Sequence, residues 1–208
     1  MRYFLTFVLA FVSLFSAHAD DQLPSRHQHL ATHIADATSS LTKEALSRAL
    51  PAPRVAAVAE RLRLLDVKII AVADSPWGLG AYYPGVIIVD SHLNDETAEV
   101  IAFVLAHEYG HHIAGHWKVE MGRALALSQD KGIEDPAQML ELLGEHPAQA
   151  QSHKHEFEAD AIAKQLLVYN NLWSPSETQR LFKTALKRHE TLSHPASDAR
   201  LEALHVQP

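Results

Sequence analysis

Ala106-His107-Glu108-Tyr109-Gly110-His111 is the stretch from which the fold and chemistry of this chain can be predicted. On an α-helix, residues four apart lie on one face about one turn from each other, so the imidazoles of His107 and His111 can bind the same ion. Glu108 is rotated by about 100° from His107, which places its carboxylate beside that ion without making it a ligand. The stretch therefore predicts a helix that carries a metal site with a carboxylate next to it.

The sequence around this stretch favours a buried helix. Asn94 or Asp95 can cap its start, and Glu96 and Glu99 fall in the first turns, where the helix dipole favours acids. No proline interrupts the run as far as Trp117. The residues before the motif are apolar nearly all round, which indicates burial and a metal site of low dielectric constant. These residues are Ile101, Phe103, Val104, Leu105 and Ala106.

The arrangement of His107, Glu108 and His111 is typical of zinc metallopeptidases, in which the carboxylate accepts a proton from the attacking water. In a chain with 15 histidines the pattern can also arise by chance, so other parts of the sequence have to support it. Because zinc takes few protein ligands, we expect His112 and His116 to be polar or packing residues.

A third ligand is needed, since a catalytic zinc site usually has three protein ligands and an open fourth position. The best candidate lies in a second predicted helix, within residues 153–163. Glu156 and Asp160 are four apart and share one face, and Ala159 is small enough to let another helix approach. Glu156 can complete the ligand set, and Asp160 can accept the ring N–H of a ligating histidine or donate a proton to a leaving amine. The alternative is a solvated acidic face, and we expect the neighbouring His155 to be a surface group.

These two segments, 107–111 and 156–160, resemble the two signatures of the HtpX-type zinc metallopeptidases. That family of gluzincins includes CAAX prenyl endopeptidases and periplasmic peptidases of outer-membrane quality control. Ser193-His194-Pro195 followed by Arg200 is similar to the family's downstream (S/T)HPxxxxR segment. The resemblance extends over roughly residues 55–205.

The resemblance implies a role for each motif residue. It implies that His107, His111 and Glu156 bind one Zn²⁺ per chain. It also implies that Glu108 is the general base and that Asp160 is a supporting or proton-donating residue.

His194 has two roles open to it if it comes close to the active centre, as the resemblance implies. It can stabilise the oxyanion, or it can occupy the open zinc position and hold the enzyme inactive. The alternative is that His194 and Pro195 only begin the last helix. Arg200 can pair with an acid near the site, but the sequence identifies no partner.

The segment before the motif helix is predicted to contain strands that could bind the substrate. Residues 67–73 and 86–89 are β-branched runs, as in two short strands. The family's segment resembling NAFALPGG has diverged here, although Pro84 and Gly85 remain. An edge strand beside the metal can pair with an extended peptide by strand addition, which would give broad specificity. A purely structural hairpin is the alternative.

We predict a mainly α fold with a small β-sheet, an α+β zincin or gluzincin-like metallopeptidase domain. Residues 1–19 are predicted to be a signal peptide, with Arg2 before an apolar run and Ala17-His18-Ala19 as the cleavage site. Residues 20–54 are predicted to be a helical segment that packs on the catalytic domain, which we assign to residues 55–208. The protein is then expected in the periplasm, with secretion as the second choice and an uncleaved membrane anchor as the alternative.

Composition narrows the function classes. The chain has no cysteine, so a metal must be held by nitrogen and oxygen ligands. A net charge of −7 without a basic block argues against nucleic-acid binding. From the motifs and the family that they resemble, we predict a zinc-dependent endopeptidase acting on unfolded or misassembled exported polypeptides, with the oligomeric state left open. The competing hypothesis is a catalytically silent zinc-binding scaffold that acts as a chaperone or binding protein.

Overall fold

The computed structural model is predominantly helical with one small sheet, which confirms the predicted α+β class. It describes residues 39, 42–64, 66–75, 78–132, 149–184 and 194–204. The predicted signal peptide at 1–19 and most of the segment 20–54 lie outside these residues. Within the described residues, no helix has both the length and the apolar character needed to cross a membrane.

The described elements follow one another along the chain as helices around a short run of strands. In order they are α3 (Pro53–Leu62), β1 (Lys68–Val72), β2 (Gly80–Tyr83), β3 (Val86–Asp90), the 3-10 helix η1 (Ser91–Asp95), α4 (Ala98–Ala114), α5 (His116–Lys131), α7 (Gln149–Tyr169), α8 (Pro175–Lys183) and α9 (Ser197–Ala203).

The sheet has the strand order β1-β3-β2. β1 and β3 are the two strands that the sequence predicts, and they pair in parallel. β2 is a third strand, which the sequence did not predict, because Gly-Ala-Tyr-Tyr shows no alternation of apolar and polar residues. It forms an antiparallel hairpin with β3. Gly85 lies in the turn at φ +75°, a left-handed conformation that favours glycine. β2 is thus an edge strand of the described sheet.

The sheet is buried on both faces, which explains its continuous apolar runs. Ala71, Ile87 and Val89 belong to the main core with α3 and α4. Ile88 and its neighbours on the opposite face pack around Ala45 instead. Successive β3 residues alternate between the two clusters, as the two-residue period of a strand requires, and one face of the sheet packs against α4.

The ends of α4 differ from the prediction. Its N-cap is Thr97, whose hydroxyl accepts a hydrogen bond from the Val100 N–H, rather than Asn94 or Asp95. The two earlier residues belong to η1, a separate short turn capped by Asp90. At the other end Gly115 adopts φ +68° and ends the helix two residues before Trp117. The chain then continues as α5.

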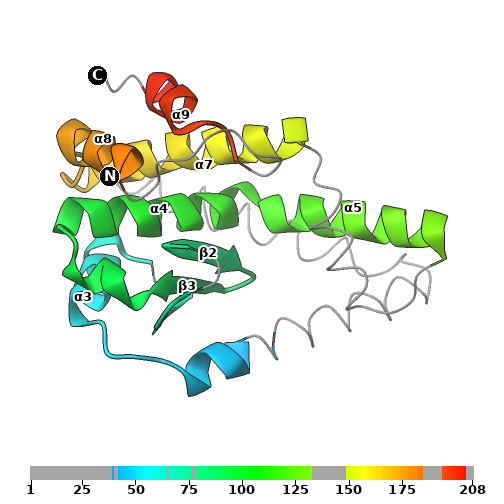
Figure 1. Cartoon of the computed structure of the whole chain (residues 1–208), viewed down its shortest axis with the longest axis horizontal. Helices are drawn as coiled ribbons and strands as arrows, with labels where there is room; N and C mark the ends of the chain where they lie inside the picture. Colours follow the sequence, from blue (N-terminus) through cyan, green and yellow to red (C-terminus); the bar gives the residue numbers. More distant parts are fainter. Residues whose placement is uncertain are drawn as a thin grey trace, which may run out of the picture.

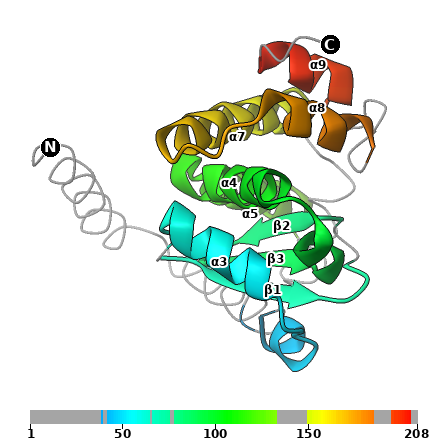
Figure 2. The same ribbon diagram turned by 90° about the vertical axis from the view of Figure 1, so that its left-hand side faces the viewer.

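The fold is layered, and α4 is its centre (Figure 1). Figure 2 shows the sheet and α3 on one side of α4, with α7, α8 and α9 on the other side. α8 packs directly on α4, where Phe182 lies against Phe103. α4 and α7 run side by side in both views, and they share the most extensive contact in the fold. A Cβ on Gly110 would lie 2.8 Å from the carbonyl oxygen of Ala159. Two small residues, one in each motif, therefore let the two motif helices approach.

Gly110→Ala is expected to destabilise the protein by about 1–3 kcal/mol, since the added methyl meets backbone atoms that cannot rotate away. The separation of α4 from α7 should also weaken zinc binding. Gly122→Ala in α5 is the matched control, because a Cβ there meets nothing within 4 Å and alanine favours a helix. Urea unfolding of both variants tests the expectation, and equal stabilities would contradict it.

Candidate metal centre

Three side chains that the sequence singled out converge between α4 and α7. The Nε2 atoms of His107 and His111 lie 3.2 Å apart. The Glu156 oxygens lie 3.4 Å from the Nε2 of His111 and 3.6 Å from the Nε2 of His107. One ligand atom from each residue fits within 4.8 Å, so the cluster could hold a metal ion. Two imidazole nitrogens and a carboxylate oxygen are a donor set that suits zinc.

Glu156 is suited to a cation because it is buried and charged. Burial alone would raise its pKa, but the close imidazoles of His111 and His194 and the charges of His107 and Arg200 hold that pKa well below its usual range. Its Oε2 atom is buried and lies 3.0 Å from Arg200 Nη1 without hydrogen-bond geometry. The donor set and this incompletely satisfied oxygen together fit a bound Zn²⁺.

Asp160 supports the cluster from beneath. The Nδ1 of His107 donates to Asp160 Oδ1 at 2.9 Å, so the ring proton is on Nδ1 and the lone pair of Nε2 faces the cluster. Arg200 donates from Nε and Nη2 to the two Asp160 oxygens, both at 2.7 Å. Burial would raise the Asp160 pKa, but the hydrogen bonds and charge of Arg200 outweigh it and lower that pKa. Asp160 is therefore an acceptor for the first ligand.

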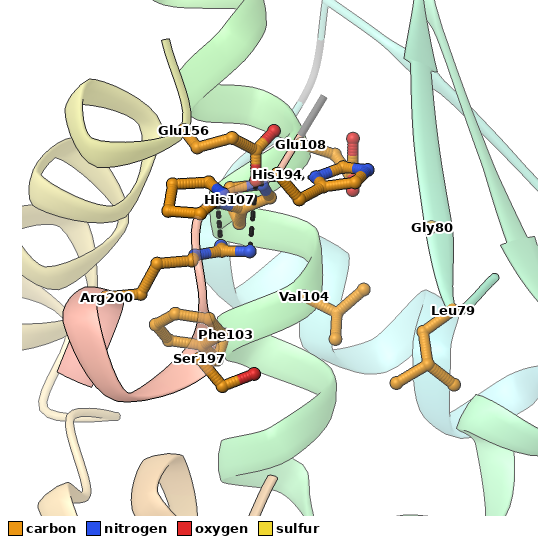
Figure 3. A pocket seen from close by; sticks show the side chains of 11 residues that line it. Leu79, Gly80, Phe103, Val104, His107, Glu108, Glu156, His194, Ser197 and Arg200 are labelled. Atoms are coloured by element: carbon orange, nitrogen blue, oxygen red, sulfur yellow. Dashed lines mark hydrogen bonds and ion pairs between the residues drawn. The ribbon is translucent and has the colours of Figure 1, made fainter. Parts of the chain in front are cut away.

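Arg200 is the partner that the sequence could not identify. It reaches from α9 towards both carboxylates of the second motif, and Figure 3 shows it beneath His107 and Glu156. Its guanidinium carbon lies 4.8 Å from the centre of the Phe182 ring, which closes the site on that side. Arg200 of the C-terminal motif thus forms ion pairs with Glu156 and Asp160 of the second motif.

Glu108 stands outside the three-residue cluster, although it is buried to a similar degree. It lines a cavity of about 60 Å³ together with His107, Glu156 and His194 (Figure 3). A Cβ on Gly80 of the edge strand would lie 3.0 Å from Glu108 Oε1. The carboxylate therefore lies between the cluster and β2, where a peptide on that strand would pass.

His194 is brought to the site as well. Its Nδ1 lies 3.2 Å from Glu156 Oε2, and its side chain remains 36% exposed. α9 begins only at Ser197, so His194 and Pro195 lie before the last helix and do not start it. It also lines a second, more open hollow of about 220 Å³ that reaches Trp117 and Tyr82. Stabilising the oxyanion and occupying the open zinc position would both require His194 to lie beside the ligand cluster, as it does here.

His155 contradicts the expectation of a surface group. It is only 5% exposed and stacks on His116, with ring centres 4.0 Å apart. His116, expected to be polar or packing, is buried, and its Nδ1 lies 2.9 Å from the Nδ1 of His111. Burial and the neighbouring charges of His111 and His155 lower the His116 pKa to about 4. These contacts depend on where α5 starts, which the helix period could not indicate.

The converging histidines and carboxylates, with an acid beside them and a cavity in front, define a candidate metal-dependent hydrolase site. The chain belongs to peptidase family M48, whose family model matches residues 54–207. This match confirms the resemblance to the HtpX-type metallopeptidases. Membership indicates a metallopeptidase, and the enzymes of the family use zinc. No curated protein and no solved structure matches the chain significantly.

Proposed function

We propose that this protein is a zinc-dependent endopeptidase that hydrolyses peptide bonds of exported or misfolded proteins. The observation that supports this most is the separation of roles in the site. His107, His111 and Glu156 form the ligand cluster, while Glu108 stays outside it and faces the cavity. A site meant only to hold zinc structurally would have no need of a free carboxylate at the open side.

When bound, Zn²⁺ would polarise the scissile carbonyl and make the attacking water more acidic. Glu108 accepts a proton from that water, because its carboxylate lines the cavity in which the water and substrate meet. The same carboxylate then returns the proton to the departing amine. Proton return by Asp160 is less favoured, since Arg200 and His107 bind both of its oxygens and its pKa is lowered.

The substrate is proposed to lie along β2. The outer side of this strand has no neighbour among the described strands, so its backbone can pair with an extended peptide. Gly80 brings the strand within van der Waals contact of Glu108. Pairing through backbone groups makes few demands on side chains, which fits unfolded polypeptides as substrates.

The cellular location is proposed from the sequence alone. Arg2, the apolar run to Phe15 and the Ala17-His18-Ala19 site support a cleaved signal peptide and a periplasmic protein. Polypeptides unfolded after export would then be the substrates that this enzyme meets.

Asp160→Ala is expected to weaken zinc retention or turnover by about 10–100-fold, as for other residues that orient a metal ligand. Without Asp160, the proton of His107 Nδ1 loses its acceptor and the ring can turn. Zinc affinity measured by competition with a chelator tests this. Asp198→Ala is a control, because that residue is exposed on the same short helix as Arg200. If the Asp160→Ala variant has the zinc affinity and turnover of the wild type, Asp160 does not support His107.

The proposed function is tested by incubating an unfolded test polypeptide with the zinc-loaded protein and identifying the new chain ends by mass spectrometry. An endopeptidase produces internal cuts at many sites. Shortening from the ends only would contradict the endopeptidase proposal. Suppressed aggregation of the polypeptide without any cut would favour the silent scaffold. The divergence of the segment 77–89 from the family pattern supports that alternative.

A further inference from the structure

We propose that His116 is a positioning residue of the metal centre, which accepts the ring N–H of His111 and so orients that ligand. The inference rests on the proposed function, because it assumes that His111 binds zinc. It gives the second histidine ligand a partner of its own, distinct from the Asp160 that supports His107.

The protons can be assigned along a chain of three side chains. His111 Nε2 faces the ligand cluster, so its lone pair is used there and its proton must be on Nδ1. An acceptor for it is the Nδ1 of His116, which lies 2.9 Å from His111 Nδ1. His116 must then carry its own proton on Nε2, which lies 3.4 Å from Glu158 Oε2. The chain His111, His116 and Glu158 therefore runs in one direction, from the site to the surface.

Burial and stacking keep the His116 ring in this orientation. The residue is 5% exposed, and the ring of His155 lies against it with an angle of 17° between the two planes. His155 is itself within 3.5 Å of Glu120 Oε1. A ring confined on its face in this way can present Nδ1 to His111 with little freedom to turn.

The turn at Gly115 makes the contact possible. His116 is five residues after His111, a spacing that would place it on another face of a continuous helix. The left-handed conformation of Gly115 ends α4 and starts α5 at His116, so the imidazole reaches back to the ligand. The two ligands consequently differ: His107 donates to a carboxylate, and His111 donates to an uncharged imidazole.

The experiment compares two substitutions in the purified protein. His116→Leu removes the acceptor, whereas His116→Asn keeps an oxygen close to the former Nδ1 position. We expect His116→Leu to weaken zinc affinity by about 10–100-fold and His116→Asn to restore most of it. His112→Asn is the matched control, because His112 follows His111 directly but hydrogen-bonds Tyr82 and Asp66 instead. It should bind zinc like the wild type.

Two further measurements make the result specific. Thermal unfolding of the metal-free variants separates lost folding from lost positioning. Proton-nitrogen correlation spectra of the histidine rings in the zinc-loaded wild type should show His116 protonated on Nε2. Equal zinc affinity in the wild type and His116→Leu, or a His116 proton on Nδ1, would overturn the inference and leave the proposed function standing. A wild type that binds no zinc would overturn both.

Discussion

Arg200→Met is expected to lower the free energy of unfolding of the metal-free protein by about 3–5 kcal/mol. Arg200 is 7% exposed and pairs with Asp160, which is 1% exposed, and with Glu156. Methionine fills much of the volume but leaves two buried carboxylates without their cation. An uncompensated buried charge costs far more than the pair itself gains.

Arg180→Met is the matched control for this prediction. Arg180 also makes two ion pairs, with Glu96 and Glu177, but its side chain is 41% exposed. Water can solvate Glu96 and Glu177 there, so the free energy of unfolding should change no more than for an ordinary surface substitution. Urea unfolding without metal measures both. Similar losses in the two variants would contradict the role given to Arg200.

Glu108→Gln is expected to reduce kcat/KM by about 10²–10⁴-fold while the zinc content stays at the wild-type level. Glutamine has nearly the same shape but cannot accept the proton of the attacking water. Zinc should be retained because Glu108 is outside the cluster of His107, His111 and Glu156. Rates measured with equal zinc content in both proteins test this expectation.

Glu99→Gln provides the control on the same helix, since Glu99 lies in the first turn of α4, away from the cavity. It should turn over substrate at the wild-type rate. Full activity of a zinc-bearing Glu108→Gln variant would remove Glu108 from the mechanism.

Much of the site could be predicted because each motif uses a helical spacing. His107 and His111 share one helix face by period alone, and so do Glu156 and Asp160. The requirement for three ligands then connects the two helices. The close approach of the two helices can also be read from the sequence, because it requires small residues at positions 110 and 159.

Features that depend on contacts between distant segments could not be predicted. β2 is a strand because it pairs with β3, whereas its own residues lack a strand pattern. The start of α4 shifted to Thr97 because the preceding residues form a turn of their own. The burial of His155 and the contact between His116 and His111 follow from the break at Gly115. A helical wheel continued through that glycine places His116 on another face than His111.

Stepwise addition of zinc to the metal-free protein, with cleavage of an unfolded polypeptide measured at each step, tests zinc-dependent hydrolysis at this site. We expect no cleavage after chelation, recovery that is complete at one Zn²⁺ per chain, and no recovery in a Glu108→Gln variant that binds the same zinc. Cleavage that persists without metal, or recovery in the Glu108→Gln variant, would contradict zinc-dependent hydrolysis with Glu108 as the base.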